Sequence, residues 1–113
     1  GPGHESVDEA GYVWIVIDRP NPYTGASTWR VQKHRFLWEQ KHGPVPEGHV
    51  LKCLDGDRSN TDPSNWEAIP MALIPRLAGK SGRDYDHAPA ELKPVIMTVA
   101  KLEHRARKSR RKR

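Results

Sequence analysis

The segment from residue 48 to residue 70 constrains the fold more than any other part of the chain, because it separates apolar runs with turn-forming residues. Val50, Leu51 and Leu54 form a short apolar run of strand length, and residues 66–69 form a second. Asp, Asn, Ser and Gly dominate between them, and these residues favour tight turns. The pattern predicts two strands joined by a turn-rich loop.

The residues around this segment predict further strands and short helices. Residues 11–17 and 28–32 are rich in β-branched and aromatic side chains, which predicts a hairpin. Residues 34–42 predict a short helix that ends at a Gly-Pro pair. Residues 70–79 predict a second helix, and Pro75 should make it short or kinked because proline breaks the helical hydrogen-bond ladder.

The longest predicted helix runs from Pro89 to about Arg107, with Pro94 tolerated in its first turns. An apolar stripe at helical spacing follows it: Leu92, Val95, Ile96, Val99, Leu102 and Ala106. Core packing and a dimer seam are the two interpretations of this stripe. The predicted fold class is α+β, with a disordered segment at 1–10, a folded domain at 11–104 and a disordered basic tail at 105–113.

Composition narrows the class of protein further. The chain of 113 residues is long enough for one small domain, and Cys53 is its single cysteine, which excludes an intrachain disulfide and a cysteine-rich zinc site. No apolar run reaches membrane-spanning length, so we expect no membrane partner and a cytoplasmic location. The net charge is +5, and cations crowd the residues after 104, which favours polyanions as partners.

Several spaced motifs together resemble the HNH endonucleases, which are also known as the His-Me finger or ββα-metal superfamily, in their phage and prophage branch. The resemblance extends from residue 34 to about residue 77. The motifs that carry it are His34-Arg35-Phe36-Leu37, Gly43-Pro44-Val45-Pro46-Glu47-Gly48, Leu54-Asp55-Gly56-Asp57, Asn60-Thr61 and Asn65-Trp66. It implies a ββα core around a metal-dependent nuclease site that acts on DNA.

The resemblance also implies that the chemical positions are substituted. The family's general-base His falls on Cys53, a metal ligand falls on Lys52, and a second ligand falls near Ile74. An ammonium group repels a divalent cation, an alkyl side chain offers no donor, and a thiol between two leucines is usually inert. We therefore expect a degenerate site with no cofactor; Mg²⁺ or Mn²⁺ enters only if the chain is an active endonuclease.

Other residues remain as candidates for such an activity. His34 and His49 are the candidates for a base, although the family pattern makes His34 part of the scaffold. Asp55 and Asp57 are the candidates for a cation site, but their spacing does not match a calcium loop. The resemblance implies instead that Asp55, with the asparagines of the loop, braces the backbone.

The cations supply the candidate contacts to nucleic acid. The predicted contacts are Lys52, Arg58, Arg76, Lys80, Arg83, Lys101, Arg105, Arg107, Lys108, Arg110 and Arg111. Three functions follow from the sequence: a DNA-binding HNH-type protein with a degenerate site, an active nuclease that uses other residues, and a phage protein-interaction module. The first predicts double-stranded DNA as the partner, and the third predicts a phage protein.

Overall fold

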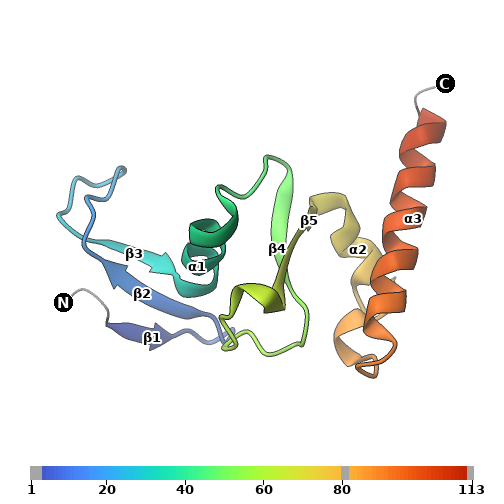
Figure 1. Ribbon diagram of the computed structural model, residues 1–113, viewed down its shortest axis with the longest axis horizontal. Coiled ribbons are helices and arrows are strands. Elements are labelled where there is room, and N and C mark those ends of the chain that lie inside the picture. Colours follow the sequence, from blue (N-terminus) through green and yellow to red (C-terminus); the bar gives the residue numbers. More distant parts are fainter. Residues whose placement is uncertain (1–3, 80–81, 112–113) are drawn as a thin grey trace.

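The computed structural model describes residues 4–79 and 82–111. The molecule is elongated, with extents of 49 × 35 × 24 Å (Figure 1). Three strands form an antiparallel sheet at one end in the order β1-β2-β3: β1 is Glu5–Val7, β2 is Val13–Ile17 and β3 is Trp29–Gln32. The predicted hairpin is therefore present, and a third strand extends it.

Strand β1 corrects the expectation that residues 1–10 lie outside the fold. Asp8 closes the turn between β1 and β2, because its carboxylate accepts bonds from the backbone N–H groups of Ala10 and Tyr12, both at 3.0 Å. The same carboxylate accepts a bond from Trp14 Nε1 at 2.8 Å. The hydrogen bond from Trp14 is the main reason that the pKa of Asp8 is lowered. Residues 1–3 lie outside the described part of the chain.

Helix α1, Lys33–His42, follows β3 directly and ends at Gly43, whose φ of 87° suits a residue without a Cβ. Its inner face buries His34 and Trp38. A second antiparallel sheet follows, with β4 at His49–Cys53 and β5 at Trp66–Pro70. This pair confirms the two strands predicted around the turn-rich loop.

The chain after β5 forms short helical segments, as Pro75 predicted. A 3₁₀ turn, η2, spans Met71–Leu73 and leads into helix α2 at Ile74–Leu77. The order of β4, β5 and α2 is the ββα order that the family resemblance implies. A further 3₁₀ turn, η3, spans Tyr85–His87 and begins after Asp84, which has a positive φ of 50°.

Helix α3, Lys93–Arg111, stands at the other end of the molecule (Figure 1). It starts later than Pro89 and continues through Arg111, so the expectation of disorder from residue 105 is wrong up to that residue. A 19-residue helix anchored by its first half can carry a charged extension, because each added residue continues an existing hydrogen-bond ladder. No described helix combines the length and the hydrophobicity that crossing a membrane requires.

The apolar stripe of α3 is only partly buried. Met97 and Ala100 face the core, with Ile96 packed against it, whereas Val95 and Leu102 are each 56% exposed. The helix is rotated relative to the expectation because the small Ala100 allows close packing against the preceding segment. The larger core cluster consists of Ile69, Leu73, Leu77, Tyr85, Met97 and Ala100. The structure is α+β, as predicted.

A second cluster joins the two sheets. Trp38 from α1 packs with Cys53 from β4 and Trp66 from β5. The imidazole of His34 stacks on Trp66 with ring centroids 3.8 Å apart and an interplanar angle of 17°. This cluster is the main apolar connection between the N-terminal sheet with α1 and the β4–β5 pair.

Candidate functional site

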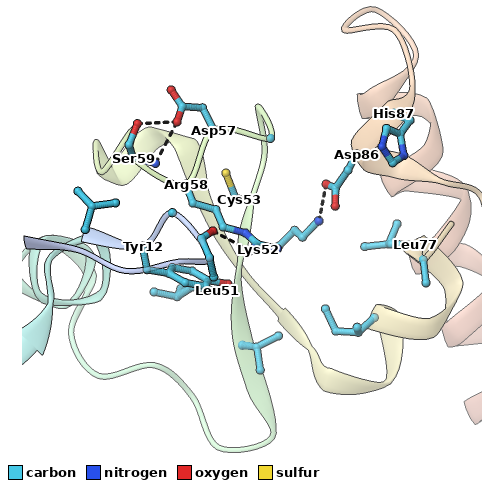
Figure 2. Close-up of a pocket in the computed structure, with 17 residues that line it drawn as sticks. Tyr12, Leu51, Lys52, Cys53, Asp57, Arg58, Ser59, Leu77, Asp86 and His87 are labelled. Atoms are coloured by element: carbon cyan, nitrogen blue, oxygen red, sulfur yellow. Dashed lines mark hydrogen bonds and ion pairs between the residues drawn. The ribbon is translucent and has the colours of Figure 1, made fainter. Parts of the chain in front are cut away.

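A cleft of about 900 Å³ lies beside β4, at the position where the family resemblance implies the nuclease chemistry; we name it the β4 cleft. Strand β4, the loop after it, helix α2 and the η3 turn all supply its walls (Figure 2). Its polar and apolar lining includes Lys52, Cys53, Asp57, Arg58, Ile74, Asp86 and His87. Lys52, Cys53 and Ile74, onto which the resemblance places the chemical positions of the family, therefore face one space.

Lys52 crosses the β4 cleft to an acidic partner. Its Nζ lies 2.7 Å from Oδ1 of Asp86, and its side chain is only 15% exposed (Figure 2). The ammonium also lies 5.1 Å from the centre of the Tyr85 ring, a cation–π distance. A carboxylate in this cleft is thus neutralised by a fixed cation rather than left open to a metal ion.

Cys53 is buried at the end of β4, with 7% of its surface exposed. Its thiol lies 3.5 Å from Oδ1 of Asp55 and accepts a bond from Asn65 Nδ2 at 3.5 Å. Burial and the neighbouring Asp55 carboxylate raise the pKa of Cys53. The neutral thiol is a poor base and a poor metal ligand.

The remaining donors of the β4 cleft do not complete a metal site. Ile74 presents an apolar side chain to it, and Asp57 accepts bonds from Ser59 N at 3.0 Å and Ser59 Oγ at 2.6 Å. Among the described residues no three His, Cys, Asp or Glu side chains are arranged so that they could hold a metal ion. The residues present therefore do not fit the divalent metal that the family implies, and we derive no step through one.

The loop between β4 and β5 is held by its own side chains, as the resemblance implied. Asp55 accepts bonds from Asp57 N at 2.7 Å, Asn60 Nδ2 at 2.8 Å and Asn65 Nδ2 at 3.0 Å. Asn65 Oδ1 in turn accepts from Asp55 N at 3.0 Å. Asp55 is thus engaged in bracing the loop and is not directed at the β4 cleft, which removes it as a cation ligand.

Neither histidine candidate reaches the β4 cleft. His34 is 4% exposed and stacked on Trp66, and burial lowers its pKa to about 4. Its Nδ1 has no hydrogen-bond partner among the described residues, so it lies in the fold as a neutral ring. His49 begins β4, where its Nδ1 lies 2.9 Å from the carbonyl oxygen of Glu47.

Five of the eleven predicted nucleic-acid contacts have partners within the fold, and Lys52 is one of them. Arg58 donates to Ala10 O at 3.0 Å and lies over the Tyr12 ring. Arg76 and Arg83 both pair with Glu103, at 3.8 and 3.1 Å. Lys101 pairs with Glu67. Arg83, which was predicted to be free for phosphate, lies beside Glu103 of α3, and its side chain remains 47% exposed.

The cations late in α3 remain exposed. Arg105, Arg107 and Lys108 lie on the surface of the helix beyond the part that packs on the core. Arg110 and Arg111 continue the backbone of α3, but their side chains lie outside the described part of the chain. Lys80 lies outside it altogether. Among the predicted contacts whose side chains are described, the exposed cations without a hydrogen-bond or ion-pair partner among the described residues therefore lie late in α3 and not around the β4 cleft.

Two residues of the β4 cleft were missed by sequence reasoning, Asp86 and His87. The interaction of His87 with Asp84 at 2.7 Å raises the pKa of its imidazole, and the side chain is 84% exposed. The polar residues around Tyr85 indicate a tight turn in the sequence. They do not indicate which strand that turn will face. The pairing of Asp86 with Lys52 spans 34 positions in the chain.

Comparison with known proteins agrees with this geometry. Residues 31–72 match the family model described as HNH endonuclease, and this segment covers α1, β4, the braced loop and β5. This match confirms the predicted resemblance to the HNH endonucleases over residues 31–72. Neither the curated proteins nor the solved structures gave a match to this chain.

Proposed function

We propose that this chain is an HNH-type protein that binds double-stranded DNA and has a degenerate nuclease site. Its family segment associates it with nucleic acid, and its exposed cations on α3 can pair with phosphates. The observation that carries the proposal is the Lys52–Asp86 ion pair, which places an ammonium group on a carboxylate of the β4 cleft, where hydrolysis needs an open metal site.

The resemblance to the phage and prophage branch supports a biological setting for this proposal. We infer a phage or prophage protein that acts on DNA in the cytoplasm of a bacterial host. Nothing in the fold depends on this setting, and the binding and cleavage experiments below do not assume it.

Binding is tested by fluorescence anisotropy with a labelled 20-base-pair duplex over a salt series. The proposal predicts affinity that falls steeply with salt, because each phosphate contact releases counterions. The triple variant R105Q/R107Q/K108Q should lose about tenfold in affinity at ~50 mM salt, and its logarithmic salt slope should flatten by about two to three. The variant K41Q removes an exposed cation outside α3 and should change affinity less than twofold. No duplex binding by the parent chain contradicts the proposal.

Cleavage is tested with supercoiled plasmid and Mg²⁺, Mn²⁺ or Zn²⁺. The parent chain should leave the plasmid intact at every concentration that retards it in a gel. Nicking that K52M, C53S and H87A all retain points to a contaminant, whereas nicking that any of these variants abolishes overturns the degenerate-site proposal.

One observation favours a second candidate function, an active nuclease that uses non-standard residues. Asp86 and His87 place a carboxylate and an imidazole in the same cleft as Cys53. In this alternative His87 would be the base that activates water. Metal-dependent nicking lost in H87A but retained in H49A would favour this alternative over DNA binding alone.

A further inference from the structure

A second cavity lies between β3 and α1; we name it the β3–α1 groove. These two elements lie away from α3 in the molecule (Figure 1). Its volume is about 620 Å³, within the range of ~300–1,000 Å³ that ligand sites occupy. It is separate from the β4 cleft and shares no lining residue with it. The HNH-type chemistry gives it no role.

Aromatic rings dominate this groove. Trp14, Tyr23, Trp29 and Phe36 all line it. Tyr23 is 86% exposed and meets Trp29 edge to face, with ring centroids 6.3 Å apart. A large aromatic side chain that is so exposed adds little to the core, and its ring face is available to a flat ligand.

Arginines alternate with these rings. Arg30 lies over the Trp14 ring at 4.3 Å, and Arg19 lies over Phe36 at 5.7 Å. Neither forms an ion pair with any residue between 4 and 79 or between 82 and 111. Arg35 pairs with Glu39 across a solvent-exposed contact at 3.3 Å. With three arginines and one glutamate in its lining, the groove carries a surplus of positive charge.

Flat aromatic faces beside arginines match the chemistry of unpaired nucleotides. Bases stack on aromatic rings, and the phosphates between them pair with guanidinium groups. In a duplex the base faces are already covered by their neighbours, so such a groove cannot use them. An acidic peptide would satisfy the arginines but would leave the exposed ring of Tyr23 without a stacking partner.

We propose that the β3–α1 groove binds single-stranded nucleic acid, with bases stacked on Tyr23 and Trp29 and phosphates paired with Arg19 and Arg30. The inference extends the proposed function, since it assumes that the ligand of this chain is nucleic acid, but it assigns a different surface. A chain with both surfaces would hold a junction at which duplex DNA opens into a single strand.

The test compares two labelled probes by fluorescence anisotropy at ~50 mM salt: oligothymidylate of 12 nucleotides and the 20-base-pair duplex. Y23A should lose about tenfold or more in affinity for oligothymidylate, because one stacked base contributes ~1–3 kcal/mol. Y23F keeps the ring and should bind within twofold of the parent chain. R30Q should lose severalfold, whereas K41Q, an equal charge change on α1 outside the groove, should not.

Each outcome decides the inference. Loss of oligothymidylate binding in Y23A and R30Q with duplex binding unchanged supports it. Equal losses on both probes would make the groove part of a duplex interface and overturn the single-strand assignment. A parent chain that binds duplex but not oligothymidylate overturns the inference and leaves the proposed function standing, whereas failure to bind either probe overturns both. Polyglutamate that competes as well as oligothymidylate would show recognition of charge alone, which also overturns it.

Discussion

The β4 cleft and the β3–α1 groove use their positive charge in opposite ways. In the β4 cleft, Lys52 is fixed on Asp86, and the cations around the cleft are tied to Ala10 or Glu103. In the β3–α1 groove, Arg19 and Arg30 lie over aromatic rings and form no ion pair with a described residue. The comparison teaches that a count of cations does not locate a nucleic-acid surface; their partners do.

The two regions are nevertheless joined through one ring. Trp66 belongs to β5, stacks on His34 of α1 and donates from Nε1 to Asn60 O at 2.8 Å. It therefore supports the helix that walls the β3–α1 groove and the loop beside the β4 cleft. Changes at this ring should affect both regions, whereas changes inside either region should affect that region alone.

The largest expected effect is therefore that of Trp66→Ala. Removal of this buried ring, which is 4% exposed, should lower the free energy of unfolding by about 3–5 kcal/mol. Urea denaturation followed by circular dichroism measures it. The matched control Tyr23→Ala removes an exposed ring and should change stability by less than ~0.5 kcal/mol. Equal effects of the two substitutions would contradict the assignment of Trp66 as the shared support.

The next effect concerns pH and His34. Its pKa of about 4 lies below the ordinary value of 6.5, so the unfolded chain binds more protons than the folded chain between these values. The free energy of unfolding should therefore fall as pH drops from about 6.5 towards 4, by about 3 kcal/mol from this residue. His34→Gln should flatten this part of the stability profile, while His49→Gln should leave it. An unchanged slope in His34→Gln would mean that the ring is not held neutral by burial.

A smaller loss of stability is expected from Asn65→Ala, which should affect the loop between β4 and β5 but not the β3–α1 groove. Asn65→Ala removes bonds to Asp55 and Asn60 and should cost about 1–3 kcal/mol, because buried groups lose their partners. Amide hydrogen exchange should show faster exchange in the loop between β4 and β5. The exposed change Ser59→Ala should have a much smaller effect. Faster exchange in β2 and β3 instead would show that the regions are not independent.

The smallest effect is expected from Lys52, the cation that the family resemblance places at the position of a metal ligand. Lys52→Met should change duplex affinity less than twofold, because its charge is already neutralised by Asp86. The same anisotropy titration should give a much larger loss for R105Q/R107Q/K108Q. A tenfold loss in Lys52→Met would move the duplex surface into the β4 cleft and remove the contrast between the two regions.

The sequence predicted the parts of this fold that depend on local chemistry. The strands on either side of the turn-rich loop and the short helix broken by Pro75 follow from residues close together in the chain. The bracing role of Asp55 was implied by the family resemblance. The family resemblance added the expectation of a ββα core around one site. Lys52, Cys53 and Ile74, the residues at the family's chemical positions, do line one cleft.

The parts that sequence reasoning missed depend on contacts between distant residues. Nothing local to Arg83 shows that Glu103 will lie beside it, and nothing local to Lys52 shows that Asp86 will. Strand β1 was missed because Glu5–Val7 is short and its pairing depends on the turn held by Asp8. The rotation of α3 depends on how closely Ala100 approaches the core.

The central claim is that the β4 cleft does not bind a divalent metal ion. A metal-binding experiment tests this claim without an assay of nuclease activity. Amide NMR spectra of the parent chain titrated with Mn²⁺ should show no selective broadening at residues 50–54 or 84–87. Lys52→Asp, which replaces the ammonium with a second carboxylate facing Asp86, should acquire such broadening. Selective broadening around Lys52 and Cys53 in the parent chain at low Mn²⁺ would contradict the claim and favour an active metal-dependent nuclease.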